Sequence, residues 1–173
     1  MTAHSSGKSA IEVRAANTPD LEAVVALVAA HGRDPARLRR RFETDLAEDE
    51  SHLVVAIADG ELVGYGRTGR FTHPPQAPRN VAPEGYYMGG LLVASVWRRR
   101  GIGEALTRAC LAWASERASE AWYFTNARNE ASLALHAKVG FVEVTRDFVY
   151  PGVSFDGGVG VLGRALRAPN GFT

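Results

Sequence analysis

Residues 91–113, LLVASVWRRRGIGEALTRACLAW, decide the fold, because they predict an apolar strand, a basic turn and a helix in direct succession. From Ile102 to Trp113 the apolar positions recur at steps of three or one, which is the rhythm of a single buried helical face. Arginines and glycines stand where this helix begins. The first turn of a helix carries unpaired backbone N–H groups and the positive end of the helix dipole, and glycine lets an anion approach that backbone closely. The turn therefore predicts a phosphate site.

The spacing of the glycines excludes two common phosphate-binding motifs. A dinucleotide fingerprint needs a third glycine three residues after Gly103, where this chain has Leu106. A P-loop needs Lys followed by Ser or Thr after its last glycine, where this chain has Glu104 and Ala105. The pattern that remains is Arg98-x-x-Gly101-x-Gly103 after an apolar strand. It resembles the acetyl-CoA pyrophosphate loop of the GCN5-related N-acetyltransferases.

A second stretch, residues 129–141 (NEASLALHAKVGF), resembles the other signature of the same family. Asn129 opens a predicted helix and Gly140-Phe141 follow it, as in the family pattern. His136 stands where the family has a tyrosine. The order of the two motifs, with one predicted strand between them, also fits, so the resemblance covers residues from about 86 to 141.

The order of the predicted elements indicates one mixed α/β domain. It runs strand, two helices, three strands, helix, strand, helix and two strands, without an internal repeat or a linker. The fourth strand is predicted over 86–93 and the sixth over 141–150, and Asp59-Gly60 predicts a hairpin turn. The resemblance implies a single twisted, mostly antiparallel sheet of about seven strands with splayed central strands, flanked by about four helices. We expect residues 1–10 to be a loose N-terminal segment and residues 11–173 to form the domain.

A proline-rich stretch, residues 72–85 (THPPQAPRNVAPEG), cannot pair continuously in a sheet. It predicts a long connection directly before the strand that would line the cofactor site. Long connections in compact domains are often functional, so a substrate lid is one interpretation and a disordered excursion is the other.

Composition sets limits on location and partners. The chain is 46% hydrophobic and 23% charged, which is ordinary for a globular protein, and its formal net charge of +1 argues against a general binder of nucleic acid. Cys110 is the single cysteine, so the sequence predicts no intrachain disulfide, no metal cluster and a reducing compartment. No apolar run approaches the about 20 residues of a membrane helix. We therefore expect a cytoplasmic protein that binds no metal and no membrane.

The resemblance implies acetyl-CoA as a co-substrate. Pantetheine would lie against the strand that ends at Val93 like an added strand, and exposed amides near Leu92 and Val93 would polarise the thioester carbonyl. The basic turn would hold the pyrophosphate, and Asn129 would face the pantetheine arm. The predicted cofactor-binding residues are Leu91, Leu92, Val93, Arg98, Arg99, Arg100, Gly101, Ile102, Gly103, Asn129 and Ser132.

The resemblance also suggests catalytic residues. His136 occupies the position of the acid that protonates the departing thiolate; the alternative is a histidine without catalytic work. For the base that removes the proton of the attacking amine we name Glu84, with His73 or ordered water as alternatives.

These residues together predict an N-acetyltransferase that transfers the acetyl group of acetyl-CoA directly to a primary amine. The acceptor stays open among small molecules, amino acids, peptides and proteins, and a homodimer is among the alternatives for the oligomeric state. One rival is a non-catalytic acyl-CoA-binding or sensing domain. The other is a nucleic-acid-binding module, which is disfavoured by the near-zero net charge and would use Arg37, Arg39, Arg40, Arg41 and Arg98 to Arg100.

Overall fold

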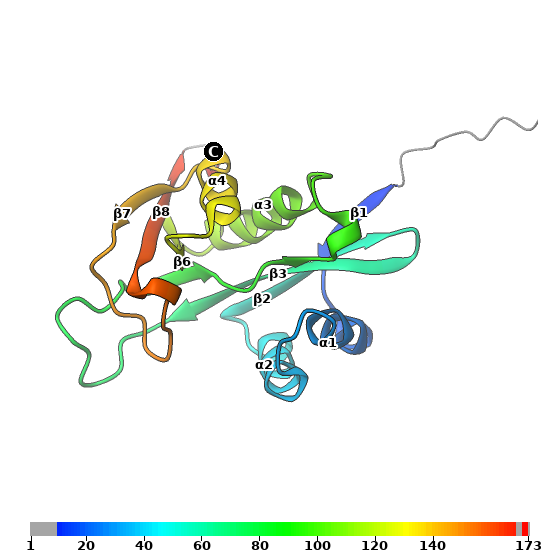
Figure 1. The fold of residues 1–173 in the computed structure, drawn as a ribbon, viewed down its shortest axis with the longest axis horizontal. Coiled ribbons are helices and arrows are strands. Elements are labelled where there is room, and N and C mark those ends of the chain that lie inside the picture. The colour runs from blue at the N-terminus through cyan, green and yellow to red at the C-terminus, as the bar shows by residue number, and fades with distance from the viewer. Residues whose placement is uncertain (1–9, 169–170, 173) are drawn as a thin grey trace, which may run out of the picture.

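A computed structural model describes residues 10–168 and 171–172, and these form a mixed sheet with helices on both faces (Figure 1). Apart from Ala10, the predicted loose segment 1–10 lies outside the described residues. The strands are β1 (Ile11–Ala15), β2 (Ser51–Ala58), β3 (Glu61–Phe71), β4 (Gly85–Met88), β5 (Leu92–Val93), β6 (Glu120–Asn126), β7 (Val142–Thr145), β8 (Gly160–Ala168) and β9 (Gly171–Phe172). The four α-helices of this described part are α1 (Leu21–Ala29), α2 (Pro35–Ala47), α3 (Ile102–Ser115) and α4 (Glu130–Lys138).

The sheet is mixed and mostly antiparallel. Its main path is β1-β2-β3-β4-β6-β8-β7, and along this path the strands pair antiparallel except for the parallel pair of β4 with β6. β2 and β3 form the predicted hairpin, with Asp59 at φ 53° and Gly60 at φ 80°. Positive φ at both central residues is what a tight hairpin turn of the primed type requires. The expectation of a mostly antiparallel mixed sheet is confirmed.

Alternating residues of the central strands supply two separate cores. On one face α1 and α2 pack against β2 and β3, with Phe42 and Tyr65 among the fully buried side chains. On the other face α3 packs against the same strands, with Leu106 and Cys110 in contact with the sheet. This arrangement follows from the period of two along a strand, which sends successive side chains to opposite faces.

A third core lies beyond the helices, where loops cover the sheet. It is built from aromatic side chains of β4 and β6, chiefly Tyr87 and Trp122, with Phe71, Phe124 and Tyr150 packed around them. The connection 72–84 and the segment 146–159 cover this region (Figure 1). They are joined by backbone hydrogen bonds from Val149 N to Asn80 O and from Ala82 N to Val149 O, each 2.8 Å long. The proline-rich connection is therefore anchored in the fold.

Two predicted strands differ from the observed ones. The strand expected over 141–150 ends as β7 at Thr145, because the chain then leaves β8 and Val149 pairs with Val81 instead. The strand expected over 86–93 is interrupted after Met88, since Gly90 takes the left-handed φ of 78° and residues 89–91 separate β4 from β5.

This interruption opens the centre of the sheet, as the resemblance implied. The pairing of β4 with β6 stops at Met88 and Tyr123. β5 then continues only along β3, where Leu92 faces Tyr65, whereas β6 continues along β8 as far as Asn126. We call the opening between β5 and the end of β6 the splay.

Candidate active site

The turn before α3 has a backbone suited to an anion. Arg99 has φ 62° and Gly101, the residue that caps α3, has φ 81°. Left-handed residues placed among right-handed or extended ones turn successive N–H groups toward one concave side, which forms an anion-binding nest. The amides of Ile102 and Gly103 follow at the start of the helix, where no preceding carbonyl of the helix can accept from them. The structure therefore provides several N–H donors and the positive end of a helix dipole at the predicted phosphate site.

The three arginines of this turn have different surroundings. Arg98 Nε donates to Val93 O at 3.1 Å and so ties the turn to the end of β5. The guanidinium of Arg100 lies 4.6 Å from the ring centroid of Trp97, and Arg99 is exposed. The one acid in the first turn of α3, Glu104, is paired with Lys138 at 2.6 Å. Hydrogen bonds from Lys138 and Arg108 lower the pKa of its carboxyl, so its charge is balanced and the turn stays basic.

The two sequence motifs meet at Gly103. A Cβ atom at this position would lie 3.6 Å from Cδ2 of Leu135 on α4 and 3.8 Å from Cδ2 of Leu91. Leu91, the start of α3 and α4 are thus in contact beside the splay. Both distances are ordinary van der Waals contacts, so the site has room for a methyl group but the surrounding side chains are close.

Asn129, Ser132 and His136 form a chain of contacts along α4. Asn129 caps the helix, with Oδ1 accepting from Ser132 N at 3.1 Å. His136 Nδ1 lies 2.8 Å from Ser132 O and 3.3 Å from Ser132 Oγ. Since a carbonyl oxygen only accepts, the neutral ring carries its proton on Nδ1, and Nε2 has a proton to donate only when the imidazole is cationic. Burial lowers the pKa of His136 and so disfavours that cation.

Tyr123 is a neighbour of His136 that the sequence did not single out. Its ring stacks on the imidazole at a centroid distance of 3.9 Å, and Phe141 packs edge-on against both rings, at 5.3 Å from His136 and 4.9 Å from Tyr123. Tyr123 is also the last residue of β6 that pairs with β4. Burial raises the pKa of its phenol, which therefore stays protonated and able to donate at neutral pH. The AWYF run of 121–124 predicted an aromatic strand but not that the ring of Tyr123 lies between His136 of α4 and Gly163 of β8.

Glu84 and His73 lie apart from these residues. The backbone amide of His73 donates to Glu84 Oε1 at 2.7 Å, and its ring Nε2 lies 3.0 Å from Ala82 O. Glu84 directly precedes β4, whereas the splay begins at the other end of this strand. At about 3.3 Å per residue, β4 alone separates the two by more than about 10 Å. The role of Glu84 as a base stays a prediction.

Comparison with known families decides what this arrangement is. Residues 14–141 match the sequence model of the acetyltransferase (GNAT) family, and they include both motifs. The chain belongs to the GNAT family. A mycothiol acetyltransferase from Paenarthrobacter aurescens is 34% identical over 116 residues, which are 66% of this chain and 34% of that protein. The match thus spans about a third of the length of this curated relative.

Solved structures show the same GNAT fold. A ribosomal-protein-alanine N-acetyltransferase from Brucella melitensis matches with a TM-score of 0.68 and 24% identity, over 90% of this chain and 99% of that chain. An aminoglycoside N-acetyltransferase in complex with CoA matches with a TM-score of 0.70 and 22% identity, over 84% of this chain and 96% of that chain. At these identities the likeness establishes the fold.

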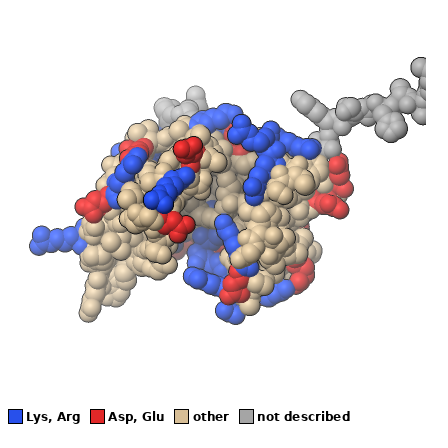
Figure 2. Space-filling model, viewed as in Figure 1, with Lys and Arg blue, Asp and Glu red and all other residues tan. Residues whose placement is uncertain are grey.

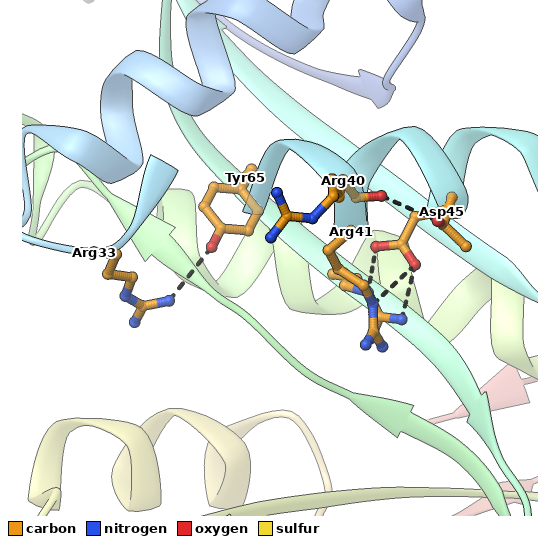
Figure 3. A network of polar contacts seen from close by, with 7 residues as sticks. Arg33, Arg40, Arg41, Asp45 and Tyr65 are labelled. Carbon is orange, nitrogen blue, oxygen red and sulfur yellow. Dashed lines mark hydrogen bonds and ion pairs between the residues drawn. The ribbon is translucent and has the colours of Figure 1, made fainter. Parts of the chain in front are cut away.

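The other side of the splay in this GNAT chain is lined from α2 and β3. Tyr65 on β3 is buried, and its hydroxyl accepts from Arg33 Nη1 at 3.4 Å (Figure 3). The carboxylate of Asp45 on α2 accepts from Nε and Nη2 of Arg67, the latter at 2.8 Å, and from Arg41 at 3.4 Å. The Arg67 carbonyl in turn accepts from Gly89 N at 2.8 Å. A buried ion pair thus supports the point where β4 ends.

The arginines predicted for a nucleic-acid-binding module do not form one surface. Arg39 pairs with Glu22 of α1, with 2.8 Å between Nη2 and Oε2, while Arg41 turns to Asp45. Among the described residues no helix is long and apolar enough to cross a bilayer, and no cluster of three His, Cys, Asp or Glu side chains is arranged to hold a metal.

Proposed function

We propose that this chain transfers the acetyl group of acetyl-CoA to the primary amine of an acceptor. One observation carries the proposal: the splay between β5 and β6 lies next to an anion-binding nest at the start of α3. An extended pantetheine arm and a pyrophosphate need such a pair of features side by side. Family membership supports the same activity over a non-catalytic acyl-CoA-binding domain.

The binding residues follow from this geometry. We assign the pyrophosphate to the amides of Gly101, Ile102 and Gly103, with Arg98, Arg99 and Arg100 supplying positive charge. We assign the pantetheine arm to Leu91, Leu92 and Val93 on one side and to Asn129 and Ser132 on the other. Amides of β5 that lie toward the thioester oxygen would stabilise the negative charge that develops there.

The reaction needs no covalent enzyme intermediate. The neutral amine attacks the thioester carbonyl carbon, the carbon–sulfur bond breaks, the amine loses one proton and the departing sulfur gains one. Two adjacent side chains can give the second proton: Tyr123 as a neutral phenol, or His136 as an imidazolium. For the first proton we retain Glu84 as the named candidate, with His73 or ordered water as alternatives.

The compartment is part of the proposal. Cys110 is a buried free thiol, and burial raises its pKa to about 11, so it is an unreactive core residue. A chain whose single cysteine is used in this way suits a reducing compartment, and we infer the cytoplasm.

A thiol-release assay tests the function. The protein is mixed with acetyl-CoA and a panel of amines, and free CoA is measured over time, with enzyme omitted in the control. Amine-dependent release above the control is the expected result. Binding of acetyl-CoA without release for any amine would instead indicate the non-catalytic domain.

A further inference from the structure

A basic groove lies on the face of the sheet that α1 and α2 cover, which we call the acceptor side. Its volume is about 640 Å³, and it is lined from the start and middle of α2 and the turn before it, with Arg33, Arg37, Arg40 and Arg41 among its residues. Figure 2 shows a hollow in the middle of one face of the molecule with basic side chains gathered in it and below it. The size suits a small molecule.

Helical geometry explains why these arginines share one side. Residues 37, 40, 41 and 44 follow one another at steps of three, one and three, so they lie on one face of α2, while Arg39 points elsewhere, toward Glu22. Figure 3 shows Arg33 joined to the Tyr65 hydroxyl, Arg40 on the Tyr65 side of α2, and Arg41 turned toward Asp45. Like charges three or four residues apart repel each other and destabilise a helix. A bound anion would neutralise part of this positive charge and so relieve the repulsion.

The positive charge of the groove is largely uncompensated. Its one acidic lining residue, Asp34, caps α2 and accepts from Ala36 N at 3.0 Å and Arg37 N at 3.3 Å. Arg37 and Arg40 are exposed, and within the described part of the chain neither has an acidic partner. The free donors of these guanidinium groups match the oxygens of a carboxylate or phosphate.

The groove adjoins the reaction site through short links. Arg33 contacts the hydroxyl of Tyr65, and Tyr65 faces Leu92 across the β3–β5 pair. A Cβ atom at Gly90 would lie 3.5 Å from the Tyr65 ring. An acceptor held by the arginines therefore lies on the α1–α2 face of the sheet, near β5 and Gly90.

The opposite wall of this region is aromatic. Tyr150 lies 4.5 Å from Phe71 and 4.5 Å from Phe124 between ring centroids, and Phe124 follows Tyr123 on β6 where the splay has opened. Burial raises the pKa of Tyr150, and the charges of Arg67 and Arg41 oppose this rise, which places its hydroxyl within reach of their field. Tyr150 thus lies toward Arg67 and Arg41, beyond the groove itself, which is lined from α2 and the turn before it.

We propose that the acceptor is a small amine that also carries a carboxylate or phosphate group, and that Arg37 and Arg40 bind this anionic group. This inference rests on the proposed acetyltransferase function. It narrows the acceptor from any primary amine to anionic amines, with the body of the molecule against the wall of Tyr150 and Phe124.

The test uses pairs of amines that differ only in the anionic group. Tyrosine is compared with tyramine, 6-aminohexanoate with hexylamine, and phosphoethanolamine with ethanolamine, by kcat/KM for acetylation. We expect the anionic member of at least one pair to be preferred by about tenfold or more, since charge-assisted contacts are roughly twice as strong as neutral ones. The first two pairs report on carboxylates and the third on phosphates. Added salt should reduce the preference.

Variants identify the residues responsible. The double substitution Arg37→Gln with Arg40→Gln should remove most of the preference by raising KM for the anionic amine, while kcat and the rate with the neutral amine stay the same. Arg39→Gln, on another side of α2, is the matched control and should keep the full preference. Both sites are on the helix surface, so the fold is expected to persist, which circular dichroism checks.

The outcomes separate this inference from the function on which it rests. Equal kcat/KM for both members of every pair, or acetylation of peptide N-termini but of none of the anionic amines, overturns the inference and leaves the acetyltransferase intact. Unchanged preference in the double variant overturns the role of the two arginines. Absence of turnover with every amine overturns the proposed function itself.

Discussion

The imidazole of His136 lies flat on the phenol ring of Tyr123, with 3.9 Å between the ring centroids and 2° between the planes. The two candidate proton donors for the thiolate are therefore in direct contact. They differ in the form that can donate: the phenol is protonated at neutral pH, while Nε2 of the buried histidine needs the cation. Replacing each residue separately distinguishes them.

Removal of the true donor should slow turnover without weakening acetyl-CoA binding. Positioned proton donors contribute about 10²–10⁴ in rate. We expect Tyr123→Phe, which deletes only the hydroxyl, or His136→Phe, which keeps a ring on Tyr123, to lower kcat by at least about tenfold. Steady-state kinetics together with acetyl-CoA binding measures both effects. If both variants turn over within about twofold of the parent, water or backbone supplies the proton.

The pH profile gives an independent distinction. Because burial lowers the pKa of His136 below its usual 6.5, an imidazolium acid would give a kcat that falls as pH rises through this lowered value, on the acidic side of pH 6.5. A phenol donor with a raised pKa would keep kcat level through neutral pH and lose it only above about pH 10. A kcat profile from pH 5 to 10 in His136→Phe and in the parent separates the two.

The same histidine makes stability depend on pH. Its pKa is lower in the folded protein than in the unfolded chain, so the unfolded chain binds more protons as pH falls below about 6.5. Stability is fully present above that pH and decreases on acidification until the folded-state pKa is reached. Urea unfolding at several pH values should show this decrease in the parent and a smaller one in His136→Phe. Parallel curves would show that other groups account for the acid sensitivity.

Gly103 offers a matched pair of variants for the phosphate site. Gly103→Ala adds a methyl group at ordinary contact distance from Leu135 and Leu91, so the rise in melting temperature on adding acetyl-CoA should persist. Gly103→Glu brings a longer side chain and a negative charge to the first turn of α3 and should abolish that rise. The helix should tolerate the new acid, because acids are favourable near a helix N-terminus. A full shift with Gly103→Glu would refute the assigned phosphate site.

The Asp45–Arg67 pair should contribute strongly to stability. The Asp45 side chain is 1% exposed and that of Arg67 is 13% exposed, so removing the carboxylate leaves a nearly buried guanidinium without its partner. Breaking a buried pair in this way costs about 3–5 kcal/mol. We expect Asp45→Asn to lower the free energy of unfolding in urea by about this amount, and Glu22→Gln, at the exposed pair with Arg39, to change it by less than about 1 kcal/mol. Similar effects of both changes would contradict a structural role for the buried pair.

Sequence patterns predicted the parts of this fold that depend on local signals. The apolar period of 102–113, the Asp59-Gly60 turn and the glycines around α3 act within a few residues, and each predicted element is present. The end of β7 at Thr145 was not predictable in this way, because it depends on Val149 pairing with Val81, far away in the chain.

In the candidate site, too, local motifs were predictable and contacts between distant elements were not. The nest and α4 came from motifs, whereas the stacking of Tyr123 on His136 depends on how α4 packs on β6. The arginines of 33–41 read as one basic run, and only the helix and its neighbours separate Arg39, bound to Glu22, from the side chains that line the groove. Glu84 was named because it directly precedes β4. An extended strand rises about 3.3 Å per residue, so the length of β4 separates Glu84 from the splay at its other end.

The bonds between the connection 72–84 and the segment 146–150 give these two loops a shared opening equilibrium. Val149 donates to Asn80 O, Ala82 donates to Val149 O, and Asn80 Nδ2 donates to Asp147 Oδ1 at 2.8 Å. The amide hydrogens of Ala82 and Val149 can exchange with solvent only when the two loops part, so both should be replaced by deuterium at one common rate. Tyr150 belongs to one of these loops, so its ring can leave Phe71 only as often as the loops part. The same opening would therefore limit how large an acceptor can enter between Tyr150 and α2.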